Sequence, residues 1–161
     1  MKLGLALDHL VDAEVGLAED FRKVGDRHAA DHDVYHQSHA FSRQCAAHVE
    51  QLQPIAERYG ANAPDDAEPG LWDSVMEAVR RRTSEAAGRR PESGVLVLRD
   101  LRDLYLAAHE TLIACVIVRQ GAMAVRDKEL LELTKELQPE TDLQMKWALT
   151  HIKISSPQVL A

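Results

Sequence analysis

The chain has 161 residues and a formal net charge of −7, and its aromatic residues are two Trp, three Tyr and two Phe. This length suits one domain with a single core, and abundant Ala, Leu, Glu and Arg beside so few aromatic residues favour helices over strands. The acidic charge excludes a general attraction to nucleic-acid phosphates or anionic lipid. No Gly-rich phosphate loop or nucleophile motif is present, which argues against nucleotide or hydrolase chemistry.

Two long helices are predicted in the first sixty residues. The first covers Leu3–His28, where apolar residues recur at steps of three and four. The second covers Val34–Tyr59, with Asp33 as its N-cap and Gly60 as its C-terminal stop. Pro54 should bend this second helix, because a proline removes one backbone hydrogen bond. The expected inward-facing row of the second helix is Phe41, Cys45, His48, Leu52, Ile55 and Tyr59.

A long connection and two further helices are predicted in the remainder of the chain. Residues 60–70 are rich in Gly, Ala, Asn, Pro and acidic residues, which is typical of turns, and a shorter amphipathic helix is expected over Leu71–Ala87. A long helix should then cover Ser93–Arg126. Asp127 is the expected N-cap of the last helix, in which Pro139 should cause a second bend.

The connection lengths predict the topology. A short connection joins two antiparallel helices, whereas a connection of about thirty residues can return the chain to the opposite end of the bundle. We therefore expect an all-α fold, a ferritin-like antiparallel four-helix bundle with a long helix-bearing crossover between its second and third helices. Residues 1–156 should form this single domain, and residues 157–161 a short C-terminal tail.

The third predicted helix is apolar nearly all round its middle. A helix in a simple bundle needs only one apolar face, so we expect a homodimer formed through this helix or through another apolar surface. Its most apolar stretch, residues 104–118, is interrupted by His109 and Glu110 and is too short to span a membrane. The N-terminus lacks the apolar core of a signal peptide. The expectation is thus a cytoplasmic protein that binds neither membrane nor nucleic acid.

Polar residues on the apolar faces of the first two helices are candidate metal ligands. Glu14 shares a face with Leu10 and Leu17, although it could instead flank that face in water. Gln44 and His48 are four residues apart and so lie on one face of the second helix. His48 could bind a metal through one ring nitrogen, or serve as a buried, hydrogen-bonded structural residue.

The last two helices offer further candidates. His109 and Glu110 stand in an apolar stretch, where a charge is costly unless it is paired or bound to a cation. An ion pair with an arginine such as Arg119 is the alternative. Glu140 and Gln144 share a face of the last helix, directly after Pro139. The candidate metal-ligand set is therefore Glu14, Gln44, His48, His109, Glu110, Glu140 and Gln144.

Four histidines around the first predicted turn follow one another at steps of four, four and three. On one continuous helix they would form a metal-binding stripe, but the expected turn should separate them. Surface histidines without a ligand are therefore expected at His28, His32, His36 and His39.

Several short motifs resemble the YciF-type ferritin-like stress proteins of bacteria. They are Asp12-Ala13-Glu14, then His48-Val49-Glu50-Gln51-Leu52 followed by Tyr59-Gly60, and a Glu-bearing apolar third helix. The resemblance implies a dimeric, rubrerythrin-like bundle with a carboxylate-rich core that can hold metal, and a role in stress response. Glu14 and Glu110 match the family's glutamates on the first and third helices. The sequence departs from the family at Arg43-Gln44-Cys45 and Pro139-Glu140, where glutamates are usual.

Two functional hypotheses follow from the sequence. In the first, the bundle core binds iron or another divalent metal ion in a stress-response context. In the second, the core holds no metal, and the protein is a helical assembly or interaction module that has kept the fold and lost the chemistry. Neutral Gln and Pro in place of carboxylates support the second hypothesis, because a pair of metal cations needs anionic ligands.

Overall fold

The computed structural model describes residues 2–61 and 93–161. This part of the chain consists of four long helices and contains no strand, so the prediction of an all-α fold is confirmed. They are α1 (Lys2–Arg27), α2 (His32–Arg58), α4 (Ser93–Val125) and α5 (Lys128–Leu160). The short helix predicted over Leu71–Ala87 lies outside the described residues. Residues 157–160, predicted as a tail, belong to α5.

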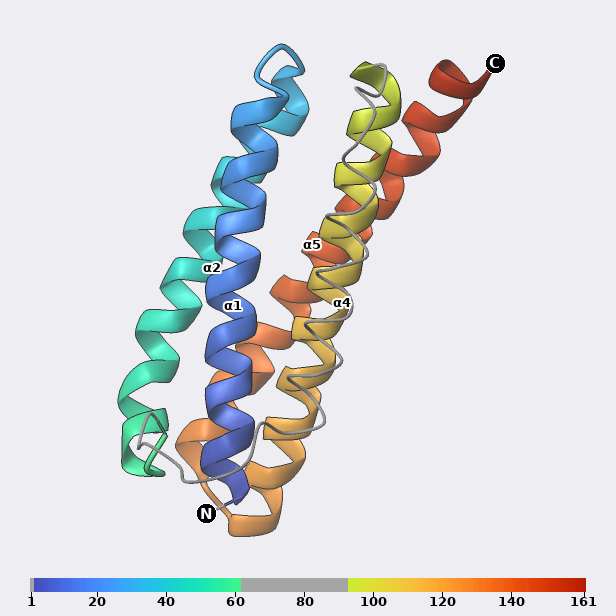
Figure 1. Ribbon diagram of the computed structural model, residues 1–161. Helices are drawn as coiled ribbons and strands as arrows, with labels where there is room; N and C mark the ends of the chain where they lie inside the picture. The colour runs from blue at the N-terminus through green and yellow to red at the C-terminus, as the bar shows by residue number, and fades with distance from the viewer. Residues whose placement is uncertain (1, 62–92) are drawn as a thin grey trace, which may run out of the picture.

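The four helices form two pairs, each joined by a short turn. The α1–α2 turn and the α4–α5 turn lie at opposite ends of the bundle (Figure 1). Consequently α4 begins at the end of the bundle opposite to the one where α2 finishes. Helix α1 also packs along α4, whereas α2 touches α5 at few positions, and the C-terminal part of α5 leans away from the α1–α2 pair (Figure 1).

The helix ends follow from capping chemistry. Asp31, not Asp33, is the N-cap of α2, because its Oδ1 accepts a hydrogen bond from the Val34 backbone N–H at 3.1 Å. The prediction of Asp33 as the cap was therefore wrong, and Asp33 lies in the first helical turn instead. Asp127 caps α5 as predicted. Gly60, with φ of 71°, stops α2 in the left-handed conformation that glycine adopts without steric cost.

The apolar core is divided into two clusters along the bundle axis. One cluster, nearer the α4–α5 turn, includes Leu7, Leu10 and Leu52, and the other, nearer the α1–α2 turn, includes Phe21 and Phe41. In the second cluster the rings of Phe21, Phe41 and Trp147 lie with centroids 5.2–6.3 Å apart. On every helix a buried polar residue lies in sequence between residues of the two clusters. These polar residues are Glu14 on α1, His48 on α2, Thr111 on α4, and Thr141 and Gln144 on α5.

Candidate functional site

The polar residues between the two apolar clusters form the candidate site. Glu14 is completely buried on α1, His48 is 2% exposed on α2, and Gln144 is completely buried on α5. Helical periodicity explains this placement, since Glu14 is four residues after Leu10 and three before Leu17 on the same inward face. The site is thus built from three helices at mid-height in the bundle.

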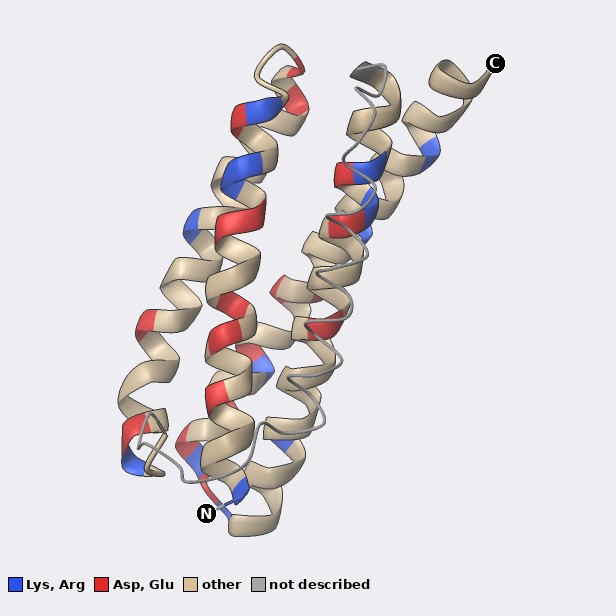
Figure 2. Ribbon diagram, viewed as in Figure 1, with Lys and Arg blue, Asp and Glu red and all other residues tan. Residues whose placement is uncertain are grey.

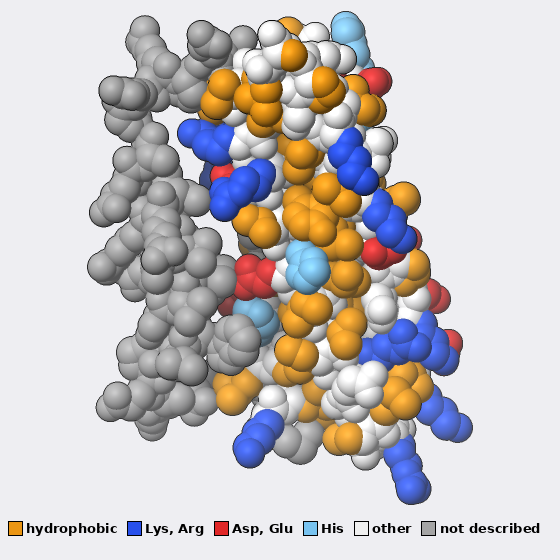
Figure 3. All heavy atoms as spheres, turned by 90° about the vertical axis from the view of Figure 1, so that its right-hand side faces the viewer, with side chains coloured by type: hydrophobic (Ala, Val, Ile, Leu, Met, Phe, Trp, Pro, Cys, Tyr) orange, Lys and Arg blue, Asp and Glu red, His pale blue; other side chains and the backbone are white. Residues whose placement is uncertain are grey.

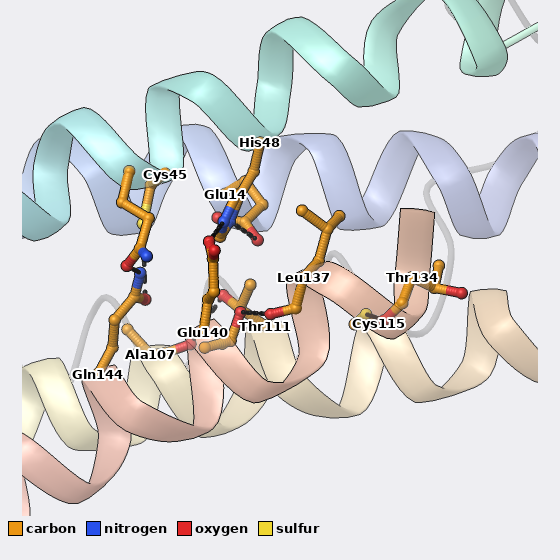
Figure 4. A network of polar contacts seen from close by, with 12 residues as sticks. Glu14, Cys45, His48, Ala107, Thr111, Cys115, Thr134, Leu137, Glu140 and Gln144 are labelled. Atoms are coloured by element: carbon orange, nitrogen blue, oxygen red, sulfur yellow. Dashed lines mark hydrogen bonds and ion pairs between the residues drawn. The ribbon is translucent and has the colours of Figure 1, made fainter. Parts of the chain in front are cut away.

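The imidazole of His48 joins two carboxylates from different helices. Its Nδ1 lies 3.0 Å from Oε1 of Glu14, and its Nε2 lies 2.6 Å from Oε2 of Glu140. Figure 4 shows the three side chains in a row, reaching from α1, α2 and α5. Glu14 is buried, whereas the side chain of Glu140 is 47% exposed. The row therefore leads from the core to the surface.

The two carboxylates favour the protonated form of His48. Burial lowers the pKa of an imidazole, but the hydrogen bonds and charges of Glu14 and Glu140 outweigh this effect and raise the His48 pKa above its usual value. A doubly protonated ring donates from both nitrogens, which suits two carboxylate acceptors. The arrangement is a buried imidazole held between carboxylates of α1 and α5, which favour its protonated form.

A second set of polar contacts adjoins the first. The Gln144 amide nitrogen donates to Oε1 of Gln44 at 2.8 Å, and the Cys45 thiol donates to Oε1 of Gln144 at 3.6 Å. Cys45 lies three residues before His48 and is completely buried. Both side chains therefore point from α2 into the layer of polar residues between the two apolar clusters (Figure 4). The two sets of contacts are neighbours on α2, where Gln44 and Cys45 precede His48 by four and three residues.

The cysteine thiols of the core are held in the neutral form. Burial is the main cause that raises the pKa of Cys45, and the charge and hydrogen bonding of Glu14 add to it. Burial and the Glu14 charge likewise raise the pKa of Cys115, on α4, to about 12. Both cysteines are free. Neither thiol is therefore activated as a nucleophile.

One oxygen of Glu14 is left without a partner. Oε1 of Glu14 binds His48, but Oε2 is buried and accepts no hydrogen bond from any group. A buried carboxylate oxygen with no partner costs free energy and calls for a specific explanation. It is the strongest sign of an additional ligand in this layer.

The structure brings five of the seven predicted ligand residues together and leaves two apart. Glu14, Gln44, His48, Glu140 and Gln144 belong to the contacts described above. His109 is exposed on α4, with its ring centroid 6.2 Å from that of Tyr105. Glu110 is about one-third exposed and faces His9 at 3.9 Å. Arg119, the arginine considered as a partner for Glu110, donates instead to Oε1 of Gln138 at 2.9 Å.

The four histidines around the α1–α2 turn do not converge on one point. His28 Nε2 lies 2.8 Å from Oδ2 of Asp100, whereas His39 faces Asp26 at 3.1 Å. The rings of His32 and His36 stack with centroids 6.1 Å apart on α2. The turn separates His28 from the other three, which stay on α2, and His28 is largely buried against Asp100, so the prediction of a surface histidine was wrong for this residue.

A two-metal carboxylate centre does not fit this layer. Such a centre takes one Glu from each of two helices and a Glu-x-x-His pair from each of the other two. At the two single-glutamate positions this chain has Glu14 on α1 and Thr111 on α4. In place of the two Glu-x-x-His pairs it has Cys45-x-x-His48 on α2 and Thr141-x-x-Gln144 on α5. Only Glu14 and His48 match. One buried carboxylate is too little anionic charge for two divalent cations.

The hydrogen-bonded layer is also not preformed as a metal site. Within residues 2–61 and 93–161, no group of three or more His, Cys, Asp and Glu side chains lies in an arrangement ready to hold a metal ion. The reason is visible at His48, whose two nitrogens face carboxylates on opposite sides of the ring. Binding would require a cation to replace the proton on one of these nitrogens.

Sequence reasoning missed Cys45, Thr111 and Thr141 as members of the layer. Cys45 was predicted only as part of the inward-facing row of the second helix, and the two threonines donate to backbone carbonyls four residues earlier. The i, i+3 spacing of Cys45 with His48, and of Thr141 with Gln144, was the available signal.

Comparisons with known proteins give no relative for this chain. No family model matches it, no curated protein matches it, and no solved structure matches it. In the part of the chain that the structure describes, none of the helices has the length and apolar character needed to cross a membrane.

Proposed function

We propose that this chain is a ferritin-like bundle, related in layout to the YciF-type stress proteins, that binds a single divalent metal ion in its core. The observation that carries the proposal is the buried Oε2 of Glu14, which has no hydrogen-bond partner and lies on the carboxylate that contacts His48. A cation placed there would satisfy this oxygen and balance its charge. A stress-response role and a cytoplasmic location remain expectations from the resemblance and the sequence.

The course of the chain supports the ferritin-like part of the proposal. The α1–α2 and α4–α5 turns lie at opposite ends of the bundle (Figure 1). Two antiparallel pairs arranged in this way need one long crossover, and ferritin-like folds contain one such connection. Thirty-one residues, 62–92, separate the two described parts of the chain.

Glu14 and Nδ1 of His48 are the proposed ligands, and Glu140 is the proposed positioning residue. Metal-binding histidines usually donate the N–H of the second ring nitrogen to a carboxylate, which fixes the ring orientation. Glu140 Oε2 already occupies this position at 2.6 Å from Nε2. A bound ion would supply Lewis acidity at the core end of the row, while Glu140 keeps the imidazole in place at the surface end.

Metal analysis of purified protein tests the proposal. Full-length protein stripped with a chelator is incubated separately with Fe²⁺, Mn²⁺ and Zn²⁺, desalted and analysed for bound metal. We expect a single ion per chain with the preferred metal, and loss of this ion in Glu14→Gln. Glu110→Gln is the matched control, since Glu110 lies outside the layer. Absence of any bound metal, or equal binding by both variants, would refute the proposal.

Self-association through α4 is a second candidate function, supported by its exposed apolar residues. Leu106, Ile113 and Ile117 are 46–49% exposed and lie seven and four residues apart, so they form one stripe. Figure 3 shows apolar side chains along much of the face that α4 and α5 present. Between Glu110 and Arg126, Arg119 is the only charged residue of α4, and this stretch is almost uniformly tan in Figure 2.

A second copy of the chain is the occupant that this stripe suits best. A two-fold dimer pairs the same patch on both subunits, and a stripe with almost no charge pairs with itself without repulsion. Light scattering coupled to size exclusion is expected to show a dimer that Ile117→Glu converts to a monomer. Val15→Glu, at a similarly exposed position on α1, should leave the dimer intact. A monomeric wild-type protein would exclude this function.

A further inference from the structure

The junction between α2 and α5 is the least extensive of the helix–helix contacts in the described part of the chain. Helix α2 packs mainly on α1, and α5 packs mainly on α4, whereas α2 and α5 approach each other at few positions. The C-terminal part of α5 also leans away from α2 (Figure 1). This junction, between residues 41–48 of α2 and residues 140–147 of α5, is called the α2–α5 seam below.

The hydrogen bonds across the α2–α5 seam are made by polar side chains. Nε2 of His48 lies 2.6 Å from Oε2 of Glu140. The Gln144 amide nitrogen donates to Gln44 at 2.8 Å, and its Oε1 accepts from the Cys45 thiol at 3.6 Å. Figure 4 shows Glu140 and Gln144 reaching from α5 toward α2. Water can replace each of these partners when the helices separate, so the hydrogen bonds themselves oppose separation only weakly.

The α2–α5 seam is already in contact with solvent at its outer edge. The side chain of Glu140 is 47% exposed, and Gln44 is half-buried. The aromatic contact across the seam, between Phe41 and Trp147 at 5.5 Å, involves a tryptophan that is also half-buried. Separation of α2 from α5 would therefore expose little additional apolar surface. Regions with few buried apolar contacts are those that open locally in folded proteins.

The buried layer behind the α2–α5 seam contains a group that the closed arrangement leaves unsatisfied. Oε2 of Glu14 is buried and accepts no hydrogen bond, which costs free energy while water is excluded. Water entering between α2 and α5 would hydrate this oxygen. The closed state is thus destabilised relative to an open, hydrated state at the position that the seam covers.

We infer that the α2–α5 seam opens while the protein remains folded, and that this opening is the route by which water and small solutes reach the buried layer around Glu14. The α1–α2 and α4–α5 pairs stay packed during the opening, because their contacts are far more extensive. The inference concerns access to the layer and does not depend on what the layer binds.

The two buried cysteines lie in different interfaces and so can report on this opening. Cys45 lies in the α2–α5 seam, whereas Cys115 of α4 donates to the Thr134 carbonyl of α5 at 3.7 Å. Both are free and completely buried. A thiol reagent therefore reaches either one only after an opening. When opening and closing are fast compared with the reaction, the labelling rate measures the fraction of open molecules.

Alkylation of the wild-type, full-length protein tests the inference. The protein is treated with N-ethylmaleimide at constant neutral pH and to a low extent, and peptide mass spectrometry gives the rate at each cysteine. We expect Cys45 to react roughly tenfold faster than Cys115 or more, because a local opening needs less free energy than global unfolding. The Cys45 rate should also depend less on urea, since a local opening exposes less surface. Equal rates with equal urea dependence at the two cysteines would overturn the inference.

A variant of Gln44 tests whether the α2–α5 seam is the route. Gln44→Ala leaves the Gln144 amide nitrogen without its acceptor in the closed state, so labelling of Cys45 should rise about 2–10-fold while that of Cys115 stays unchanged. Gln51→Ala is the matched control, because Gln51 is exposed on the same helix. A Cys45 rate that responds equally to both variants would overturn the seam as the route. If circular dichroism shows that Gln44→Ala does not fold, the wild-type comparison of Cys45 with Cys115 decides.

Discussion

Nδ1 of His48 lies 3.0 Å from Oε1 of Glu14, between two apolar clusters and with both residues almost completely buried. This contact ties α1 to α2 at mid-height of the bundle. A buried charge pair of this kind adds little net stability compared with an apolar pair, yet the loss of one partner leaves the other charge buried alone. The contact is therefore expected to matter more for specificity and ligand binding than for stability.

Replacement of His48 in metal-free protein tests whether an isolated buried charge costs more stability than the loss of the whole pair. His48→Leu leaves Glu14 buried without its partner and should lower the free energy of unfolding by about 3–5 kcal/mol. The double variant Glu14→Leu/His48→Leu removes both charges and should recover most of that loss. Glu140 remains in both variants, but its side chain is 47% exposed and can be hydrated. Urea unfolding with a chelator present measures both values.

A double variant no more stable than His48→Leu would contradict this interpretation. It would mean that the pair itself, rather than the isolated charge, dominates the energetics of the layer.

Asp100 at the start of α4 should make stability depend on acid pH. Burial alone raises the pKa of this carboxyl, but hydrogen bonds from His28, Arg27 and Arg99 outweigh burial and lower it. His28 and Arg27 each lie 2.8 Å from Oδ2 of Asp100. Asp100→Asn should therefore lower the free energy of unfolding at neutral pH by about 1.5–3 kcal/mol, the usual contribution of hydrogen bonds to a charged group.

The sign of the pH effect follows from the lowered pKa. The stabilisation by Asp100 is complete above the pKa of the unfolded chain, about 3.9, and is lost as the pH falls through the lower pKa of the folded protein. The difference between wild type and Asp100→Asn should shrink over that acid range in thermal unfolding. The control is Asp103→Asn, because burial raises the pKa of Asp103 despite Arg102 and Arg99. A difference that grows toward acid pH would contradict the assignment.

The sequence predicted the helices well because their apolar periodicity is regular. On α1, Glu14 stands between Leu10 and Leu17 in an otherwise apolar row, so spacing made it a candidate for the inward face but did not exclude a place at the edge of that face. Residues four apart on one helix, such as Gln44 with His48, were grouped by the same spacing, and each contacts a residue of α5. The N-cap of α2 could not be identified from the sequence, because Asp31 and Asp33 both precede an apolar run. Only the hydrogen bond from the Val34 backbone N–H to Asp31 distinguishes them.

The positions of His109 and Glu110 could not be inferred. Their helix, α4, is apolar nearly all round, so no polar face defines which side is inward. The structure places Thr111 inward and His109 outward. Contacts between helices were equally beyond the sequence, since the 2.6 Å contact of His48 with Glu140 joins residues 92 positions apart.

Two glycines of α1 should respond oppositely to alanine. A Cβ on Gly4 would lie 2.5 Å from the Tyr59 carbonyl oxygen, a backbone atom that cannot move aside freely. Gly4→Ala should therefore lower the free energy of unfolding by about 1–3 kcal/mol, as overpacking does. A Cβ on Gly16 would meet no atom within 4 Å, so Gly16→Ala should stabilise the helix by about 0.5–1 kcal/mol. Thermal unfolding of the two variants should shift in opposite directions. Shifts in the same direction would disprove the close approach of α1 to Tyr59.

Asp127 should contribute more than an N-cap, because it also holds the end of α2. Its Oδ1 accepts from the Leu130 backbone N–H at 3.0 Å, and its Oδ2 accepts from the Tyr59 hydroxyl at 2.7 Å. Within residues 2–61 and 93–161, the side-chain contact of Asp31 is the capping bond at 3.1 Å. Asp31→Ala should cost about 1 kcal/mol, and Asp127→Ala should cost a further ~0.5–1.5 kcal/mol for the tyrosine hydrogen bond.

A double-mutant cycle isolates this second contribution. Asp127→Ala and Tyr59→Phe remove the two partners of one hydrogen bond, so their effects on the free energy of unfolding should not add, and the coupling should be about 0.5 kcal/mol or more. Asp31→Ala and Tyr59→Phe lie at opposite ends of α2 and should be additive. Because Asp127 starts α5 and Tyr59 ends α2, a measured coupling would mean that the two helix pairs are joined at this end by a side-chain contact as well as by packing. Additive effects in both cycles would leave Asp127 as a cap alone.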